Sequence, residues 1–473
     1  MHTFVYGLGS IVQTGLGFIL IPLYTRQFTA ELYGVFTLIT LAGTLAGAFF
    51  YLGASSAMAR SYYDYERVRE RQLVVSTALA ISLSGALGQI LLGAMFGGDI
   101  SRALFHTAEY RPHIILALFS SAAAFLNNLF FVLLRFQRRS VSVVVLNLGT
   151  LVVTTALIFY LLLVANLGVM APIAGTLAGQ LLLLGSMLVL ARKSLVPRVS
   201  RKELRLQIAF GIPNLVAGLA YYALDSIDRF FINEFGSLSD VGVYSLGYKI
   251  GMVIQIILVM PFCQIWAPMR MEYREESDAP ELFGLVLTYF AMAGLLVTAT
   301  VSVFSRELVQ ILTGHPEYVQ AYLVVPIVML AHLLYGSVNI VDNGIVFSRK
   351  VVYHVYIFSF ALLVNVGLNL WLIPIYGYIA AAWTTLACYA LIIGMVVPVS
   401  NRLYRVPWEW YRLALLVGTT VTVIVLAAAF DVAGPGGVLM KIALLAALVG
   451  SWYLLALHAW ERRLVALVLS SRS

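Results

Sequence analysis

Long, nearly uninterrupted apolar runs follow one another along almost the whole chain, and this feature limits the possible folds more than any other. A transmembrane helix needs about 20 apolar residues to cross the roughly 30 Å of hydrocarbon in a bilayer. Short polar connections separate runs of about that length throughout the 473 residues. The fourteen predicted spans cover residues 3–24, 33–58, 73–96, 114–134, 141–163, 169–191, 207–233, 241–267, 282–304, 321–347, 351–373, 378–399, 410–430 and 438–460.

The composition excludes the common alternatives to a helical membrane protein. Hydrophobic residues make up 61% of the chain and charged residues only 11%, whereas charged residues are about 25% of an ordinary soluble protein. A transmembrane β-barrel would show segments of about ten residues with alternating apolar and polar side chains. The sequence therefore predicts an all-α, polytopic membrane protein with about 14 transmembrane helices and no sizeable soluble domain.

Basic residues are divided unequally between the two sets of connections. Lys and Arg are retained on the cytoplasmic side of a membrane. Twenty-three of them flank one set of connections, and only Arg26, Arg102, Arg111 and Arg306 flank the other. We therefore predict that both termini lie in the cytoplasm. The same asymmetry explains the net charge of +8 without a nucleic-acid partner.

Short motifs in the first half of the chain recur in the second half at a nearly constant offset of 204 to 209 residues. The matched pairs are Gly7-Leu8-Gly9-Ser10-Ile11 with Gly211-Ile212-Pro213-Asn214-Leu215, Tyr33-Gly34-Val35-Phe36 with Val241-Gly242-Val243-Tyr244, and Gly168-Val169 with Gly377-Tyr378. Six spans per repeat bring both halves into the membrane in the same sense, as in transporters built from parallel repeats. The predicted parts are two six-helix lobes, residues 1–200 and 201–405, and an additional pair of C-terminal helices, residues 406–473.

Charged residues inside the apolar spans are the main candidates for function. A charge near the bilayer centre is costly and usually faces a cavity or a partner. Asp225, Asp228 and Arg229 lie three and four residues apart in the seventh span, so they share one helical face. Lys249 in the eighth span is expected at the same depth as Asp225. Two interpretations stay open: an ion-pair cluster that neutralises itself, or a polar, switchable site that faces a cleft between the lobes.

Two further charged residues lie near the predicted cytoplasmic surface. Arg60 ends the second span, where it fits either an interfacial arginine that extends toward water or a contact with a phosphate group. Asp342 lies beside Asn339 and Asn343 in the tenth span. Its carboxylate fits either a hydrogen-bonded packing role or the binding of a cation or a proton.

Several motifs of enzymes are missing from the sequence. It contains no GxxxxGK[ST] motif of a P-loop ATPase and no HExxH motif of a zinc protease. A membrane-embedded glycan polymerase or ligase would need a large external loop to carry catalytic residues, and the longest predicted outer connection, near Arg102 to Arg111, is too short. We therefore expect no enzymatic activity, no cofactor and no metal.

The chain resembles the polysaccharide transporter family of the multidrug/oligosaccharidyl-lipid/polysaccharide exporter superfamily, whose best-known members are flippases for O-antigen and capsule-type lipid-linked oligosaccharides. Four stretches carry the resemblance and together span most of residues 1–400. They are Gly15-Leu16-Gly17-Phe18 through Pro22-Leu23-Tyr24-Thr25-Arg26 to Tyr33-Gly34-Val35-Phe36; Gly53-Ala54-Ser55-Ser56-Ala57-Met58-Ala59-Arg60-Ser61-Tyr62; Asp225-Ser226-Ile227-Asp228-Arg229-Phe230 with Val241-Gly242-Val243-Tyr244-Ser245-Leu246-Gly247-Tyr248-Lys249-Ile250; and Asn365 and Asn369 through Ile373-Pro374 and Tyr376-Gly377 to Ala380-Ala381-Ala382.

The resemblance implies a secondary transporter in the bacterial cytoplasmic (inner) membrane. Its substrate would be an undecaprenyl-pyrophosphate-linked oligosaccharide, flipped from the cytoplasmic to the periplasmic leaflet with H⁺ or Na⁺ as the coupling ion. Arg60, Arg229 and Lys249 match the recurrent basic sites of the family and are the candidates for binding pyrophosphate or glycan. The ion-coupling or ion-pair candidates are Asp225, Asp228 and Asp342. A multidrug exporter of the same superfamily is the alternative.

Overall fold

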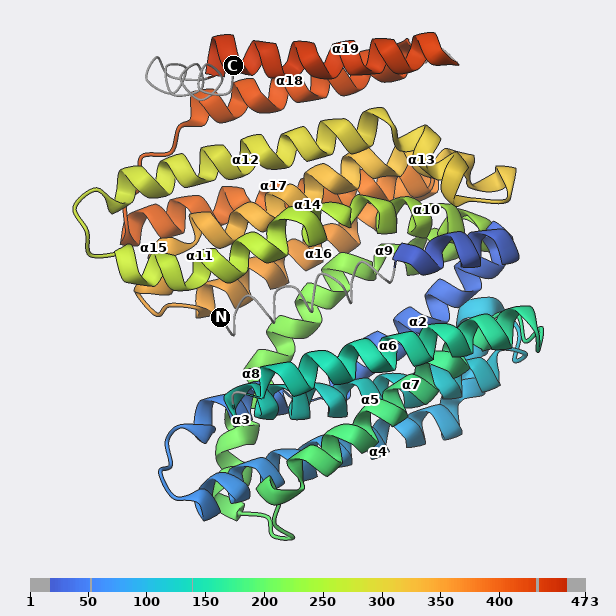
Figure 1. Cartoon of the computed structure of the whole chain (residues 1–473), viewed down its shortest axis with the longest axis vertical. Coiled ribbons are helices and arrows are strands. Elements are labelled where there is room, and N and C mark those ends of the chain that lie inside the picture. Colours follow the sequence, from blue (N-terminus) through green and yellow to red (C-terminus); the bar gives the residue numbers. More distant parts are fainter. Residues whose placement is uncertain (1–17, 52, 138, 431–433, 457–473) are drawn as a thin grey trace. The chain divides into compact units, whose positions relative to one another are not determined.

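The fold comes from a computed structural model that describes residues 18–51, 53–137, 139–430 and 434–456 (Figure 1). Every regular element in these ranges is a helix, which confirms the predicted all-α class. Twelve helices or helix pairs there are long and apolar enough to cross a membrane. The predicted seventh span is a helix that is interrupted at Ile227, near its C-terminal end. Most of the predicted first span, including Gly7, Gly9, Gly15 and Gly17, lies outside the described residues.

Local sequence signals fix where individual helices begin. The Thr29 hydroxyl accepts a hydrogen bond from the Leu32 amide at 3.3 Å and caps the helix α2 (Ala30–Phe50). Ser200 caps α8 (Arg201–Ser226) in the same way through the Glu203 amide. Capping of this kind satisfies amide groups that the first helical turn leaves without a partner.

Two glycines at positions paired in the predicted repeat share the same backbone conformation. Gly168 precedes α7 (Met170–Ala191) and Gly377 precedes α17 (Tyr378–Leu403), at equivalent positions 209 residues apart. Both have a positive φ, 52° and 68° respectively. Only glycine adopts this region of φ readily, so the two connections turn in the same way.

The chain forms two compact units, and the first comprises Met1–Ser245 with the segments Thr313–Tyr318 and His354–Ala381. Its core lies where α4, α5 and α7 pack together around Phe130, Leu133 and Met187. Its elements are α2, α3 (Ala54–Tyr62), α4 (Val68–Phe105), α5 (Arg111–Phe136), α6 (Ser140–Leu163), α7, the 3-10 turn η1 (Arg192–Ser194), α8, α9 (Asp228–Phe235), the first part of α10 (Leu238–Gly251) and most of α16 (Val352–Tyr376).

The second unit comprises Leu246–Leu312, Val319–Tyr353 and Ala382–Ser473. Within it α12 packs against α14 and α18, and α18 packs against α19. Its elements are the end of α10, the π-helical turn η2 (Gln255–Val259), α11 (Met260–Tyr273), α12 (Ala279–Val303), α13 (Ser305–Leu312), most of η3 (Pro316–Leu323), α14 (Val324–Val341), α15 (Asn343–Phe347), most of α17, α18 (Trp410–Ala429), α19 (Pro435–Ser451) and the π-helical turn η4 (Trp452–Ala456).

Ion pairs attach the C-terminal helix pair to the rest of the second unit. The Lys441 ammonium on α19 lies 2.5 Å from a carboxylate oxygen of Glu307 on α13. Before α18, the Glu409 carboxylate accepts hydrogen bonds from Arg412 at 2.8 Å and from Thr288 of α12 at 2.6 Å. The pair α18 and α19 is therefore bonded through polar groups to α12 and α13, in addition to its apolar packing.

Helices α2 and α10 meet at the glycines of the repeated motif. A Cβ atom on Gly242 would lie 1.9 Å from the carbonyl oxygen of Ala30, and one on Gly34 would lie 2.0 Å from that of Leu238. Gly34 and Gly242 are equivalent positions 208 residues apart, as are Ala30 and Leu238. The repeat thus produces a reciprocal contact in which each backbone approaches the glycine of the other helix.

Candidate functional site

The predicted seventh span carries a buried ion pair at the point where its helix breaks. Helix α8 ends at Ser226 and α9 begins at Asp228, so Asp228 occupies the first turn of the second helix. Its carboxylate accepts hydrogen bonds from the backbone amide of Arg229 at 2.8 Å and from the Arg229 guanidinium at 3.0 Å. Asp228 is fully buried and Arg229 nearly so. The break therefore places a carboxylate and its counter-charge next to each other in the interior of the first unit.

A tyrosine from the next helix completes this cluster. The Tyr244 hydroxyl on α10 donates a hydrogen bond to the second carboxylate oxygen of Asp228. The Arg229 guanidinium carbon lies 5.4 Å from the centre of the Tyr244 ring, within the range of a cation–π interaction. Sequence analysis did not single out Tyr244 as a site residue, although it closes the repeated motif Val241-Gly242-Val243-Tyr244. The sequence held one indication of this role, because Tyr244 is an aromatic hydroxyl in the predicted span that follows the one with Asp228 and Arg229.

Arg229 and Asp228 therefore balance each other's charge, as in the first of the two interpretations from sequence. Arg229 also donates to the backbone carbonyl oxygen of Asp225 at 2.9 Å, one turn earlier. The Asp225 side chain is half-buried. A buried ion pair with a further hydrogen bond on each partner is strongly oriented, and loss of one partner leaves an uncompensated charge. This geometry holds the guanidinium in a fixed position within a helix pair that is already interrupted.

Lys249 lies in the second unit, near the end of α10, and is half-buried. Among the residues that the structure describes, its ammonium group has no hydrogen bond and no ion pair. Shortly after it the helix continues through the π-helical turn η2, and such turns are frequent at functional sites. A half-buried ammonium without a carboxylate partner suits an anionic ligand better than a structural role.

Asp342 is held by an arginine that the sequence did not identify. The Arg270 guanidinium on α11 donates to the Asp342 carboxylate at 2.6 Å and to the Asn339 carbonyl oxygen at 2.9 Å. The Trp266 indole donates to that same carbonyl oxygen at 2.9 Å. Arg270 and Asp342 are 72 residues apart, so no local spacing pointed to this pair. The contact favours the packing interpretation of Asp342 over a cation site, because a cation already occupies its carboxylate.

Arg60 lies in the last turn of α3. Its side chain is exposed, and its guanidinium carbon lies 4.7 Å from the centre of the Phe210 ring on α8. In the described part of the chain no carboxylate lies within ion-pair distance of Arg60. The ring orients the guanidinium without cancelling its charge, a geometry compatible with both interpretations of Arg60.

Polar side chains also connect helices within each unit. In the first unit, Asn127 on α5 donates to the backbone and side-chain oxygens of Gln180 on α7 at 2.9 and 2.8 Å. In the second unit, the Gln255 amide lies 3.1 Å from a ring nitrogen of His332. Hydrogen bonds of this kind hold membrane helices together.

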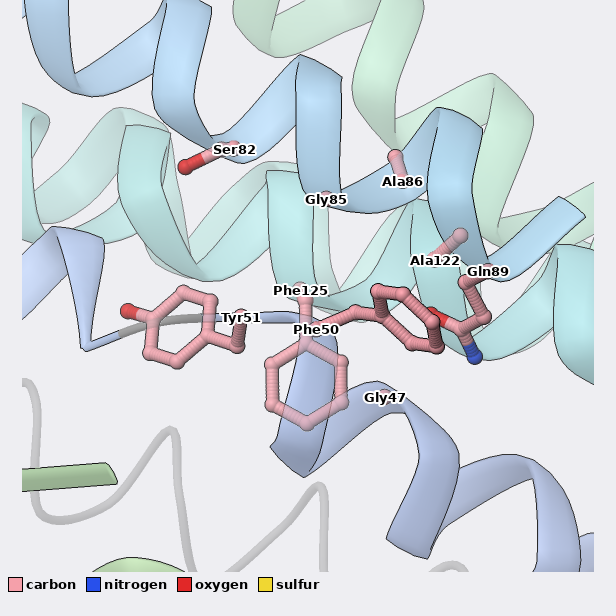
Figure 2. Close-up of a pocket in the computed structure, with 9 residues that line it drawn as sticks. All are labelled: Gly47, Phe50, Tyr51, Ser82, Gly85, Ala86, Gln89, Ala122 and Phe125. Atoms are coloured by element: carbon pink, nitrogen blue, oxygen red, sulfur yellow. The ribbon is translucent and has the colours of Figure 1, made fainter. Parts of the chain in front are cut away.

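One small pocket in the first unit lies between the end of α2 and the helices α4 and α5 (Figure 2). It spans roughly 200 Å³ of space free of protein atoms, part of which is open to the outside. The side chains that line it include three aromatic rings and no charged group, so it does not suit a pyrophosphate. The lining residues are Gly47, Phe50, Tyr51, Ser82, Gly85, Ala86, Gln89, Ala122 and Phe125.

Comparison with known families identifies the chain. The family described as "Polysaccharide biosynthesis protein" matches residues 2–273, which include the Asp228–Arg229–Tyr244 cluster and Lys249. The chain belongs to this polysaccharide biosynthesis family. No curated protein matches the sequence.

Solved structures show which fold this member of the polysaccharide biosynthesis family has. A lipid II flippase, MurJ, in an inward closed conformation matches with a TM-score of 0.76 and 12% identity, over 95% of this chain and 99% of that one. An inward-facing multidrug resistance transporter of the MATE family, from the MOP superfamily, matches with a TM-score of 0.65 and 14% identity, over 85% and 95%. The MATE multidrug transporter DinF-BH matches with a TM-score of 0.63 and 18% identity, over 85% and 94%.

These matches place the chain in the MOP-like transporter fold, as a multi-pass membrane protein. The family concerns polysaccharide biosynthesis and the matching structures are flippases and transporters rather than enzymes. At 12 to 18% identity the structures report on the fold and not on the substrate.

Proposed function

We propose that the protein is a secondary flippase that moves an undecaprenyl-pyrophosphate-linked oligosaccharide from the cytoplasmic to the periplasmic leaflet of a bacterial inner membrane. The cargo would serve the synthesis of O-antigen or a related surface polysaccharide. No covalent chemistry is required, because the pyrophosphate and the sugars only need a polar path while the prenyl chain stays in lipid. Both termini would lie in the cytoplasm, in accordance with the distribution of Lys and Arg.

The observation that supports this proposal most is Lys249, a cation inside an apolar span of a polysaccharide biosynthesis protein that forms no ion pair among the described residues. Burying Arg229 in the membrane is costly, and its oriented ion pair with Asp228 offsets part of that cost. A planar guanidinium forms strong, paired hydrogen bonds with phosphate oxygens. We infer that the pyrophosphate headgroup contacts Arg229, Lys249 and Arg60 at different stages of the passage.

The test replaces the buried cations one at a time in cells that lack any other flippase for the same glycan. Arg229→Ala and Lys249→Ala should each reduce surface glycan at matched protein levels, because each removes a contact with the headgroup. The matched controls are Arg102→Ala and Lys350→Ala, which delete exposed cations of the same chemistry and should leave surface glycan unchanged. Normal glycan in both buried variants would remove these residues from the mechanism.

Coupling to an ion gradient requires a carboxylate that can change its charge or its partner. Asp225 is the candidate, because its side chain is half-buried one turn before Arg229. Asp225→Asn should reduce transport and change its dependence on Na⁺ or pH. Transport that continues at full rate after all gradients are collapsed would contradict a secondary mechanism.

Export of drugs or other small molecules, coupled to a cation, is the second candidate function. Two of the matching structures are multidrug transporters of the MATE family, and they cover 85% of this chain. A deletion strain would then become sensitive to drugs while its surface glycan stayed normal. The flippase proposal predicts the opposite pattern, with glycan lost and drug sensitivity unchanged.

A further inference from the structure

One end of the first unit carries a dense, exposed set of cations, which we call the basic platform. It comprises the ends of α3, α5 and α7, the starts of α4, α6 and α8, and the connector that joins α7 to α8. Twelve described cations share this surface with four carboxylates, and eleven of the cations are exposed. The cations are Arg60, Arg67, Arg69, Arg71, Arg135, Arg139, Arg192, Lys193, Arg198, Arg201, Lys202 and Arg205.

The connector of the platform is bonded to α4 and is not a loose loop. The amide of Val196 donates to the Ser76 hydroxyl at 2.8 Å, and the amide of Ser200 donates to the Thr77 hydroxyl at 3.1 Å. The Gln72 side chain donates to the backbone oxygen of Lys193 at 2.8 Å. These bonds hold the cations in fixed places above the hydrophobic core of the unit.

A tyrosine between α3 and α4 fixes the start of α8. The Tyr65 hydroxyl donates to the Glu203 carboxylate at 2.5 Å, and this hydrogen bond raises the pKa of Tyr65. The hydroxyl is therefore protonated at neutral pH and the contact is retained. Glu203 is the buried carboxylate of the platform, so its charge is directed inward and does not neutralise the outer surface.

Aromatic rings, rather than carboxylates, orient several platform cations. Arg60 lies over Phe210, Arg71 lies 5.3 Å from the centre of the Tyr62 ring, and Lys202 lies 5.5 Å from that of Tyr65. A cation–π contact positions the cation while its positive charge stays available to an outside anion. Among the described residues none of these three cations forms an ion pair.

Large apolar side chains are exposed between the cations. Val68 lies between Arg67 and Arg69 and is 72% exposed, and Val199, beside Arg198, is 52% exposed. Exposed apolar side chains are unfavourable in water but are typical of a surface that lies against a bilayer, with basic groups beside them. This alternation distinguishes a membrane surface from a site for a soluble polyanion.

We propose that the basic platform binds the phosphate headgroups of anionic bilayer lipids and thereby fixes the depth and tilt of the first unit in the membrane. The cations lie within a few residues of the ends of apolar helices, at the depth where headgroups are found. Near an anionic surface each Lys or Arg increases the affinity by a factor of about five. The proposal does not depend on the cargo, so it can fail or succeed separately from the flippase function.

The test measures lipids retained by the purified full-length chain in native mass spectrometry. Phosphatidylglycerol and phosphatidylcholine with identical acyl chains are added to the detergent-solubilised protein. The wild type should retain phosphatidylglycerol preferentially. The variant R198Q/R201Q/R205Q should reduce that preference roughly 100-fold, because each cation contributes a factor of about five. The variant R198K/R201K/R205K should keep the preference, because it retains the charge.

The matched control is R26Q/R102Q/R111Q, which removes the same amount of charge from exposed positions outside the platform and should keep the preference. An equal loss in this control, or no loss in R198Q/R201Q/R205Q, would overturn the proposal. If the platform variant does not fold, the salt dependence of lipid binding by the wild type is the second measurement. Its preference should vanish in about 1 M salt, where the Debye length is about 3 Å, and a preference that persists there would contradict an electrostatic surface.

Discussion

At the scale of single residues, several buried charges in the described part of the chain are arranged in pairs with tightly specified partners. Asp228 accepts hydrogen bonds from Arg229 and Tyr244, and Asp342 accepts one from Arg270. Removing one member of a buried pair typically costs about 3–5 kcal/mol, whereas replacing both can be neutral. Stability and transport can therefore be separated by comparing single and double variants.

The first prediction concerns the Asp228–Arg229 pair. Asp228→Asn should destabilise the protein by about 3 kcal/mol, because it leaves the Arg229 charge buried without its counter-charge. D228N/R229Q should recover most of that stability and still fail to export glycan, because the headgroup contact is gone. Thermal unfolding in detergent and surface glycan are the two measurements. Export restored by the double variant would show that the pair has only a structural role.

The second prediction concerns Tyr244. Tyr244→Phe removes the hydroxyl donor from a fully buried carboxylate and should lower stability by about 1–3 kcal/mol. Transport should fall by more than the loss of stability accounts for. The Tyr244 hydroxyl orients the Asp228 carboxylate, which in turn positions the Arg229 guanidinium. Tyr63→Phe is the control, since Tyr63 is 61% exposed. Equal unfolding temperatures for both variants and the wild type would contradict the assigned hydrogen bond.

The third prediction concerns Asp342 and Arg270, whose side chains are 8% and 12% exposed. Asp342→Ala should cost about 3–5 kcal/mol, and D342A/R270M should regain most of it. Protein abundance and unfolding temperature report the effect. A stable Asp342→Ala variant whose transport had lost its ion dependence would instead favour the cation-site interpretation of Asp342.

At the scale of helices, the apolar runs were sufficient to predict twelve of the fourteen spans as the structure has them, but not where the helices break. Span length depends only on hydrophobicity, which the sequence displays directly. The break between α8 and α9 and the π-helical turn η2 depend on packing that no local pattern encodes. For the same reason the sequence identified Asp228 and Arg229 but neither Tyr244, 16 residues away, nor Arg270, 72 residues from Asp342.

The fourth prediction concerns the reciprocal contact between α2 and α10. Gly242→Ala places a methyl group 1.9 Å from the Ala30 carbonyl oxygen, so the helices must separate, at a typical cost of about 1–3 kcal/mol. We expect reduced stability and reduced export. Gly185→Ala in α7 is the control, because nothing lies within 4 Å of its added methyl group. A neutral Gly242→Ala would mean that the two backbones are not in close contact.

At the scale of the whole molecule, our proposals assign two effects to the charge asymmetry: the orientation of the chain in the membrane and the contact with anionic lipid. The connector cations Arg198 and Arg201 belong to the set of 23 that the sequence assigned to the cytoplasm, and Arg102 and Arg111 belong to the opposite set. From counting alone the sequence predicts this orientation, which stays a prediction. It could not predict that hydrogen bonds to α4 hold the connector in place.

The fifth prediction tests this orientation in cells. In a background without Cys263 and Cys388, Glu109→Cys should react with a membrane-impermeant maleimide added to spheroplasts. Val199→Cys should react only after the membrane is permeabilised, because the connector faces the cytoplasm. Both positions are exposed in the structure. Labelling of Val199→Cys in intact spheroplasts would reverse the assigned topology.

The central claim is that this polysaccharide biosynthesis protein moves a lipid-linked pyrophosphate glycan with the help of buried cations. Its most direct test is reconstitution of the purified chain into liposomes that contain a fluorescent undecaprenyl-pyrophosphate-linked oligosaccharide in both leaflets. A membrane-impermeant quencher then reports exchange between leaflets. We predict rapid exchange with the wild type and exchange close to that of protein-free liposomes with R229A/K249A. Exchange at the same rate with both proteins, or with neither, would contradict the account.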